Sequence, residues 1–447
     1  RVLFRSQVLK DMNPGFLRFP GGCIVEGKNL SNRYQWKDSV GPVETRKYNW
    51  NRWQTEVGRA YVYHQSYGLG FYEYMLLCED IGAKALPVLN CGMGCQYQDS
   101  DVVPLDQLQP YIDDAIDFIE FCNGDPATNE WAALRAEMGH PEPFNLEYLA
   151  IGNEQWDWEY FERYDMFQAQ IAPLYPEIKL LSTTGPNLDS STWNNGKEWL
   201  SDKDRTHSWA YDEHYYVSEA QMLGQYFDRY ADENKYPRTE DGPYVFAGEY
   251  ACHAGGAPTR EMTLRQAIVE AAYMTTFEKN ADIVKLASYA PLFAKADHVQ
   301  WNPNLIYATN TCAYGQPSYW TQWMYATNIG DYQLDNQLSL KSDEEVEIPV
   351  AQGKAGFATW ITQARYDNFK VTSNVDGSVL AEYDFEDAAD ADAFTSFSNN
   401  GSWSVENGYY QQSATPNNVA VGKITGDETW SNYTIEVDAM KYGGNEG

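Results

Sequence analysis

Short apolar runs alternate with longer helical stretches from Phe16 to about Tyr325. Each run spans a few residues and ends at a polar residue or a glycine, which is typical of buried strands. The predicted strands are Phe16–Phe19, Ala85–Leu89, Tyr148–Ile151, Lys179–Ser182, Trp209–His214, Tyr244–Gly248 and Ile283–Tyr289. Apolar residues at helical spacing predict helices over Gly70–Ile81, Leu105–Phe121, Tyr160–Ile171 and Leu264–Lys279.

This alternation predicts βα units and a parallel sheet, so the fold class is α/β. Seven strands are visible where a closed (β/α)8 TIM barrel has eight. Because residues 1–13 resemble the middle of a helix and Arg1 is not an initiator methionine, we expect a fragment that lacks the first strand. The alternative is an open doubly wound sheet, but no glycine-rich phosphate turn follows the first visible strand.

The pattern changes after Asn328 to short alternating segments separated by turn residues, which predicts an all-β sandwich. The predicted strands there are Gly356–Thr362, Tyr366–Thr372, Val379–Phe385, Trp403–Glu406, Asn418–Ile424 and Asn432–Lys441. We expect three regions, a catalytic barrel over 1–327, a β-sandwich segment or linker over 328–377, and a second β-sandwich over 378–447. The chain stops just after a strand, so we expect this last region to be truncated.

The amino-acid composition disfavours some classes of binding partner. The formal net charge is −32 and the sequence pI is near 4.4, which disfavours phosphate backbones and anionic membrane surfaces. No run of 18 apolar residues predicts a membrane span. The chain has 34 Tyr and 15 Trp. Such a high aromatic content is typical of proteins that bind sugar rings, and it is equally consistent with aromatic side chains that fill a large core. The seven cysteines of the chain do not suggest a disulfide framework, and no CxxC pair suggests zinc.

Two glutamates follow predicted strands and carry the strongest chemical signal. Glu154 follows the strand Tyr148–Ile151, and Glu249 follows the strand Tyr244–Gly248, 95 residues later. A barrel unit takes about 31 residues, so the two carboxylates would lie on strands n and n+3 and open onto the same face. Paired carboxylates across a barrel mouth are the apparatus of glycoside hydrolysis. The alternative is that both are surface glutamates.

A second acidic motif, Asp212-Glu213-His214, raises the alternative of a metal site. Consecutive residues on a strand point to opposite faces, so the three side chains would not converge on one ion. We therefore expect no metal and no cofactor.

Six motifs in order resemble the α-L-arabinofuranosidases of glycoside hydrolase family 51. They are FLRFPGGC (16–23), WKDSVGPVE (36–44), IGNE (151–154), DEHYY (212–216), GEY (248–250) and WNPNLIY (301–307). That resemblance implies a barrel enzyme that acts with retention. It also implies a sugar-contacting glutamate on a strand before Arg1, and a β-sandwich assembled from both termini. At the other end, YDFE (383–386) and GSWSVENG (401–408) resemble the start of a laminin-G or concanavalin-like module.

The resemblance assigns roles to matching positions. Glu154 is implied as the acid/base and Glu249 as the nucleophile. The implied substrate-binding residues are Arg18 under the site, Cys23 against the sugar, Trp53 as a stacking wall, Asn153 at the 2-hydroxyl, His214 and Tyr216 beside the nucleophile, and Asn302 after the last strand. For Cys23, a small packed thiol is an equally good interpretation.

These implications predict a retaining, exo-acting α-L-arabinofuranosidase on arabinoxylan, arabinan or their oligosaccharides. Two alternatives stay open, a β-glycanase or other furanosidase on the same barrel and a non-catalytic glycan-binding protein. Chemistry directed at polymers suggests an extracellular or periplasmic location. The sequence leaves a homo-oligomeric state open.

Overall fold

A computed structural model describes residues 4–50, 64–202, 208–238, 242–253, 262–296, 299, 301–330, 352–360, 362–398, 401–415 and 420–444. The chain divides into two compact units, Arg1–Leu334 and Asp335–Gly447. Across the described residues, no helix has the length and apolar character needed to cross a bilayer.

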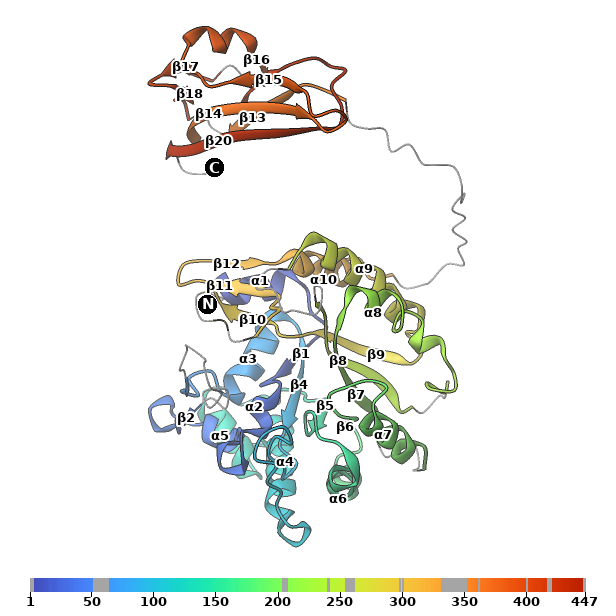
Figure 1. Ribbon diagram of the computed structural model, residues 1–447. Helices are drawn as coiled ribbons and strands as arrows, with labels where there is room; N and C mark the ends of the chain where they lie inside the picture. The colour runs from blue at the N-terminus through green and yellow to red at the C-terminus, as the bar shows by residue number, and fades with distance from the viewer. Residues whose placement is uncertain are drawn as a thin grey trace. The chain divides into compact units, whose positions relative to one another are not determined.

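The first unit contains a parallel sheet of seven strands whose spatial order is their order along the chain (Figure 1). Its strands are β1 (Phe16–Phe19), β4 (Lys84–Leu89), β5 (Tyr148–Ile151), β6 (Lys179–Thr183), β7 (Ala210–Ser218), β8 (Tyr244–His253) and β9 (Val284–Tyr289). All seven predicted strands are therefore confirmed. The described strands form a nearly closed barrel with β1 and β9 as its ends.

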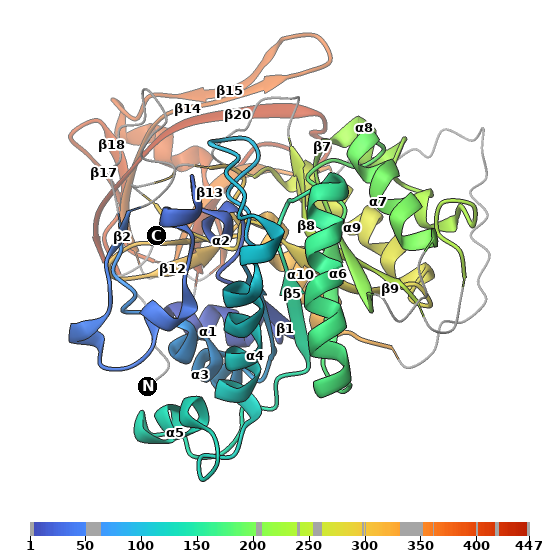
Figure 2. The same cartoon turned by 90° about the horizontal axis from the view of Figure 1, so that it is seen from below.

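Helices surround the outside of these strands, as Figures 1 and 2 show for α3, α4, α6, α7 and α9. The described α-helices are α1 (Phe4–Asp11), α2 (Cys23–Glu26), α3 (Phe71–Ile81), α4 (Gln109–Asn123), α5 (Glu130–Glu137), α6 (Asp157–Leu174), α7 (Ser191–Asp202), α8 (Glu219–Leu223), α9 (Leu264–Lys279) and α10 (Pro317–Thr327). The four helices predicted between strands correspond to α3, α4, α6 and α9.

Local sequence explains where these helices start and stop. Thr263 and Gln266 form a capping box at the start of α9, in which the Gln266 side chain accepts a hydrogen bond from the Thr263 amide at 2.8 Å. Gly82 ends α3 in the left-handed conformation, with φ of 76°, where a glycine carries no steric cost.

The barrel interior is filled by apolar side chains from alternate strand positions, as the period of two requires. They are Leu86, Val88, Tyr148, Ala150, Leu181, Ala210 and Phe246, and Val25 of helix α2 packs with them. Two residues after Ala210 on the same face of β7 comes Asp212, which is 3% exposed. Polar side chains therefore begin where the apolar layer ends, toward the carboxyl ends of the strands.

Five further short strands are described in the first unit. The pair β2 (Asn49–Trp50) and β3 (His64–Gln65) is antiparallel. The other strands, β10 (Phe293–Lys295), β11 (Ile306–Ala308) and β12 (Ala313–Gly315), form a small sheet.

The second unit holds two antiparallel sheets around one core. One sheet has β13 (Ala355–Trp360), β19 (Ala420–Thr425) and β16 (Thr395–Ser398), and the other has β15 (Val379–Tyr383), β14 (Thr362–Ser373), β18 (Tyr409–Gln412), β17 (Trp403–Glu406) and β20 (Tyr433–Gly444). Phe357 of the first sheet stacks on Tyr366 of the second, with ring centroids 4.0 Å apart. The predicted all-β region is confirmed.

The structure joins the two C-terminal regions that the sequence separates at residue 377. Strand β14 lies before that boundary and pairs with β15, β18 and β20, which all lie after it. Strands β13 and β14, which lie before residue 377, therefore belong to the same two sheets as the strands that follow it.

Candidate active site

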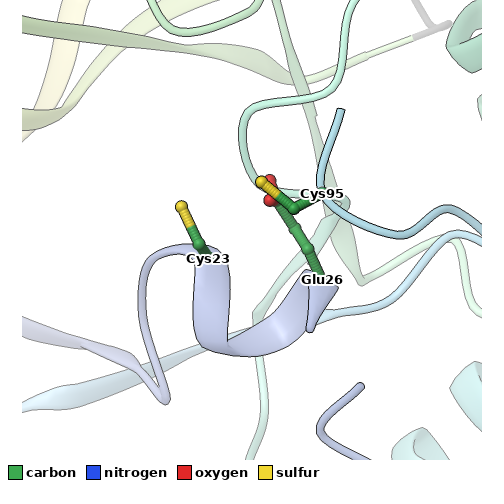
Figure 3. Close-up of side chains that lie close together, drawn as sticks. All are labelled: Cys23, Glu26 and Cys95. Carbon is green, nitrogen blue, oxygen red and sulfur yellow. The ribbon is translucent and has the colours of Figure 1, made fainter. Parts of the chain in front are cut away.

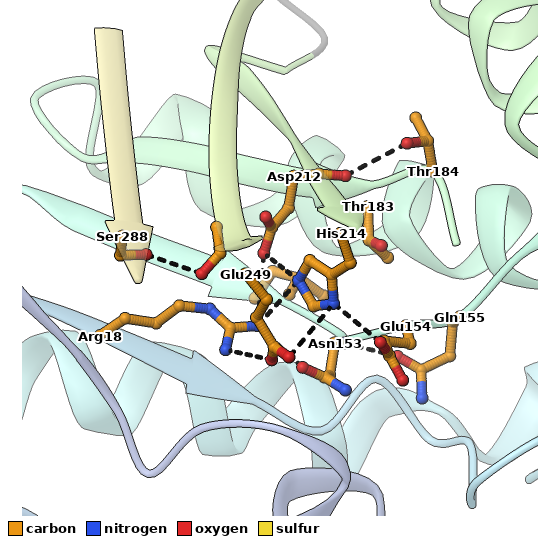
Figure 4. A network of polar contacts seen from close by, with 12 residues as sticks. Arg18, Asn153, Glu154, Gln155, Thr183, Thr184, Asp212, His214, Glu249 and Ser288 are labelled. Atoms are coloured by element: carbon orange, nitrogen blue, oxygen red, sulfur yellow. Dashed lines mark hydrogen bonds and ion pairs between the residues drawn. The ribbon is translucent and has the colours of Figure 1, made fainter. Parts of the chain in front are cut away.

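The two glutamates singled out by the sequence face each other: Glu154 lies three residues after the end of β5, and Glu249 lies within β8. A carboxylate oxygen of Glu154, one of Glu249 and a ring nitrogen of His214 all lie within 4.8 Å of one another. The register of the barrel explains this meeting, because His214 on β7 is paired directly with Glu249 on β8. Figure 4 shows the His214 ring between the two carboxylates.

Glu249 is held by two hydrogen-bond donors and lies close to one ring nitrogen, and all three groups come from strands β1 and β7. Arg18 of β1 donates to one carboxylate oxygen at 2.9 Å, and Tyr216 of β7 donates its hydroxyl to the other at 2.7 Å. His214 Nδ1 lies 3.7 Å from that second oxygen. Burial alone would raise the pKa of Glu249, but the positive charges of His214 and Arg18 and these hydrogen bonds hold it below its usual value. The carboxylate is therefore ionised and fixed in direction.

His214 lies between the carboxylates of Glu154 and Asp212, and the Arg18 guanidinium is 3.5 Å from its Nε2. Its Nδ1 is 2.9 Å from Glu154 and its Nε2 is 3.1 Å from Asp212. Burial would lower the pKa of this imidazole, but Glu249, Asp212 and Glu154 together raise it well above its usual value. A protonated His214 donates to Glu154 and Asp212 at once, and its Nδ1 also lies 3.7 Å from Glu249.

Asn153 is positioned by the same network. Its side-chain oxygen accepts a hydrogen bond from Arg18 at 2.8 Å, and its side-chain nitrogen donates to Glu26 at 3.0 Å. The residue is fully buried and precedes Glu154 directly. This arrangement fixes the turn on which Glu154 stands.

Glu26 was not found as a site residue from the sequence. It lies on the short helix α2 that follows β1, is 2% exposed, and also accepts a hydrogen bond from the Glu154 backbone amide at 3.1 Å. Burial, and then the charge of Glu154, raise the pKa of Glu26. The only available signal was an acidic residue four positions after the Gly21-Gly22 turn.

Asp212 is a second residue whose role the sequence did not assign. Its carboxylate accepts from Arg18 at 3.3 Å and contacts His214 at 3.1 Å. Glu213, its neighbour, points away and accepts hydrogen bonds from Trp193 and Tyr236. The motif therefore splits across the two faces of β7, as the sequence analysis expected.

The remaining predicted residues have fewer described contacts with the two carboxylates. Cys23 is half-buried and its sulfur lies 3.7 Å from Glu154, so it lies beside the carboxylates. Asn302 accepts a hydrogen bond from the Tyr307 hydroxyl at 3.2 Å. Its neighbour Trp301 is 42% exposed and packs edge-on against Tyr216, with ring centroids 5.6 Å apart. Trp53 lies outside the described residues.

The triad of Glu154, His214 and Glu249 has the spacing of metal ligands. A cation is already present there, however, because Arg18 forms an ion pair with Glu249 at 2.9 Å. A divalent metal would have to compete with that buried guanidinium. This arrangement suits proton transfer and nucleophilic attack, with fixed charges instead of a metal.

Comparison with known proteins gives the family. The family model of the α-L-arabinofuranosidase 1 domain matches residues 8–236, and that of the α-L-arabinofuranosidase C-terminal domain matches residues 248–422. The chain belongs to the α-L-arabinofuranosidases of glycoside hydrolase family 51. The resemblance stated from the six motifs is thereby confirmed. The second model also covers most of the segment that resembles a laminin-G or concanavalin-like module.

Individual relatives agree with this assignment. The chain is 40% identical to an extracellular exo-α-L-arabinofuranosidase of Streptomyces chartreusis, over 99% of this chain and 51% of that protein. It is 37% identical to α-L-arabinofuranosidase 1 of Arabidopsis thaliana, over 77% of this chain and 46% of that protein. The chain thus spans about half the length of these curated relatives.

Solved structures share the fold. An arabinose-bound family 51 α-L-arabinofuranosidase superposes with a TM-score of 0.62 at 23% identity, covering 98% of this chain and 66% of that one. An α-L-arabinofuranosidase of Thermotoga maritima in complex with arabinose gives a TM-score of 0.56 at 15% identity, covering 98% and 89%. At these identities the likeness shows the architecture alone.

Proposed function

We propose that this chain is a retaining, exo-acting α-L-arabinofuranosidase in which Glu249 is the nucleophile and Glu154 the acid/base. The observation that carries the proposal is that carboxylate oxygens of the two residues lie within 4.8 Å of each other. Retaining glycosidases hold the two carboxyl groups about 5–5.5 Å apart, whereas inverting ones need about 6.5–9.5 Å to admit a water. The short separation favours double displacement.

In the first step, Glu249 attacks the anomeric carbon while Glu154 gives its proton to the departing glycosidic oxygen. The bond to the leaving group breaks and a glycosyl ester forms on Glu249. In the second step, Glu154 takes a proton from water, whose oxygen attacks the same carbon and releases Glu249. The contacts of Arg18 and Tyr216 with Glu249 favour this role, because they keep the carboxylate charged and aimed before attack.

The residues around the two carboxylates favour a furanose ring as the bound sugar. Asn153 lies between Arg18 and Glu26, where its amide would meet the sugar 2-hydroxyl as positive charge develops on the ring. Cys23 and the exposed ring of Trp301 would contact the sugar from either side of the carboxylates, and Trp53 and Asn302 stay predictions. We propose side-chain arabinose of arabinoxylan, arabinan or their oligosaccharides as substrate.

A panel of p-nitrophenyl glycosides tests this function. We expect the chain to hydrolyse the α-L-arabinofuranoside at least about 100-fold faster than β-D-xylopyranoside, β-D-glucopyranoside or α-L-arabinopyranoside, because a site shaped for a furanose leaves polar groups unpaired with a pyranose. Preference for a β-D-glycoside would favour the β-glycanase alternative. Binding of arabino-oligosaccharides without turnover would favour a glycan-binding protein.

The contacts that lower the pKa of Glu249 lead to a prediction about the pH dependence of activity. Tyr216→Phe removes the hydroxyl that donates to Glu249 at 2.7 Å, so the pKa of that carboxyl should rise. Since the nucleophile must be ionised, the acidic limb of the kcat/KM profile should move to higher pH, and the maximal kcat/KM should fall about tenfold. Tyr314→Phe, at an exposed tyrosine of β12, is the matched control. An unmoved acidic limb in Tyr216→Phe would show that this hydroxyl does not tune the nucleophile.

We also propose an extracellular or periplasmic location. The support is the relative from Streptomyces chartreusis, which is named as extracellular, together with a chemistry directed at polymers. Fractionation of cells that make the protein, followed by antibody detection, tests it. Recovery in the cytoplasm alone would contradict the proposed location.

A further inference from the structure

A second cluster of metal-ligand side chains lies directly beside Glu154. The sulfurs of Cys23 and Cys95 and a carboxylate oxygen of Glu26 all lie within 4.8 Å of one another. Figure 3 shows Cys23 and Glu26 projecting from α2 and Cys95 reaching the same place from the chain that follows β4. The proposed reaction uses neither Cys95 nor the second oxygen of Glu26.

The two segments that carry these side chains are fastened to each other. The Cys95 amide donates to the Gly27 carbonyl at 3.2 Å, and the Asp99 amide donates to the Lys28 carbonyl at 3.3 Å. An ion pair between Lys28 and Asp99, at 3.3 Å, joins the same segments at the surface. Within α2, Cys23 and Glu26 are three residues apart and so share one face. The three ligands are therefore held in place before any ion arrives.

The chemistry of this donor set suits a thiophilic divalent cation. Cysteine thiolates and carboxylates are both ligand types of Zn²⁺, with Zn–S of about 2.3 Å and Zn–O of about 2.0–2.2 Å. Tetrahedral angles then place ligand atoms about 3.6–3.8 Å apart, so sub-ångström to ångström shifts of side chains would close the site. Among the described residues, no lysine or arginine forms an ion pair with the buried Glu26 carboxylate, and Glu154 adds a second negative charge nearby.

We propose that Cys23, Glu26 and Cys95 form an inhibitory site for Zn²⁺ or a similar thiophilic divalent cation. On binding, each thiol loses its proton to solvent and both sulfurs and the Glu26 carboxylate coordinate the ion. Glu154 Oε2 lies 3.7 Å from the Cys23 sulfur, so it completes the coordination as a fourth ligand. The inhibitory part rests on the proposed function, because a metal-bound Glu154 can no longer protonate the leaving group.

Cobalt titration of the reduced chain tests binding without reference to activity. One equivalent of Co²⁺ should produce a thiolate-to-cobalt charge-transfer band in the near ultraviolet, and Zn²⁺ should abolish it. Cys95→Ser should lose most of this band, and Cys23→Ser with Cys95→Ser should lose all of it. Cys312→Ser, at an exposed cysteine, should keep it. Absence of a band in the unaltered chain, or its persistence in the double variant, would overturn the site.

Kinetics test the inhibitory part separately. Zn²⁺ should inhibit hydrolysis of the aryl arabinofuranoside and EDTA should restore it. Cys95→Ser should need at least about tenfold more Zn²⁺ for half inhibition, while its activity without metal stays that of the unaltered chain, since serine can still donate to Glu26. Equal zinc sensitivity in Cys95→Ser would overturn the inhibitory role. A chain that shows the cobalt band but hydrolyses no glycoside would contradict the proposed function and uphold the metal site.

Discussion

Glu249→Ala lowers kcat/KM on an aryl α-L-arabinofuranoside by at least about 10⁴-fold, because the variant lacks the group that forms the glycosyl ester. Azide restores turnover by entering the space left by the carboxylate. Since azide then attacks from the nucleophile's side and no second displacement follows, the product is the β-L-arabinofuranosyl azide. Product analysis by NMR checks the configuration.

Two further variants make this result interpretable. Glu249→Gln keeps the shape of the side chain, and it shows whether loss of activity comes from chemistry instead of unfolding around the buried charges of Arg18 and His214. Glu162→Ala, at an exposed glutamate of α6, should keep full activity. Retained activity in both Glu249 variants, with folding intact by circular dichroism, would contradict the nucleophile assignment.

Glu154→Ala has an effect that depends on the leaving group. On poor leaving groups such as the arabino-oligosaccharides, kcat/KM should fall about 10³–10⁴-fold, because the glycosidic oxygen departs without a proton. On a dinitrophenyl arabinofuranoside the glycosylation step should be nearly unaffected, and the glycosyl-enzyme should accumulate because no base activates water. Burst kinetics measure this accumulation.

The configuration of the azide product also distinguishes the acid/base from the nucleophile. In Glu154→Ala azide should attack the glycosyl-enzyme from the side of the lost acid/base and give the α-L-arabinofuranosyl azide. The same variant assayed on both substrate types is its own control. Equal losses on dinitrophenyl and oligosaccharide substrates, or a β-azide product, would show that Glu154 is not the acid/base.

The apolar patterns predicted the barrel strands well. Strands β1 and β5 have the bounds that the sequence predicted, since their apolar runs end at Pro20 and Gly152. Strands β7 and β8 extend beyond the predicted bounds, to Ser218 and His253. Their outer halves contain polar and aromatic residues that pair with each other, for example Tyr215 with Tyr250. The spacing of apolar residues along the sequence does not reveal such pairing.

Strands of polar composition were missed for the same reason. Neither β16 nor β18 was predicted, because TSFS and YYQQ carry little alternation. Gln412 of β18 is nonetheless fully buried, and its amide donates to the Thr362 carbonyl at 3.1 Å. A buried amide that satisfies backbone groups looks like a surface residue in the sequence.

The two carboxylates could be found from the sequence because strand ends and spacing place them on one barrel face. The residues that position these two carboxylates could not be found from the sequence. Glu26 and Asp212 act through contacts with residues far along the chain, Glu26 with Asn153 and Asp212 with Arg18. Arg18 of β1 meets Asp212 of β7 and Glu249 of β8 only because the sheet curves into a barrel, so no local pattern reveals these partners.

The stereochemical course of hydrolysis tests the central claim, that Glu154 and Glu249 act together by double displacement on an α-L-arabinofuranoside. Proton NMR of the reaction in its first minutes, before the sugar mutarotates, identifies the anomer released. The account predicts α-L-arabinofuranose as the first product. Release of the β-anomer, or no hydrolysis of this substrate, would contradict it.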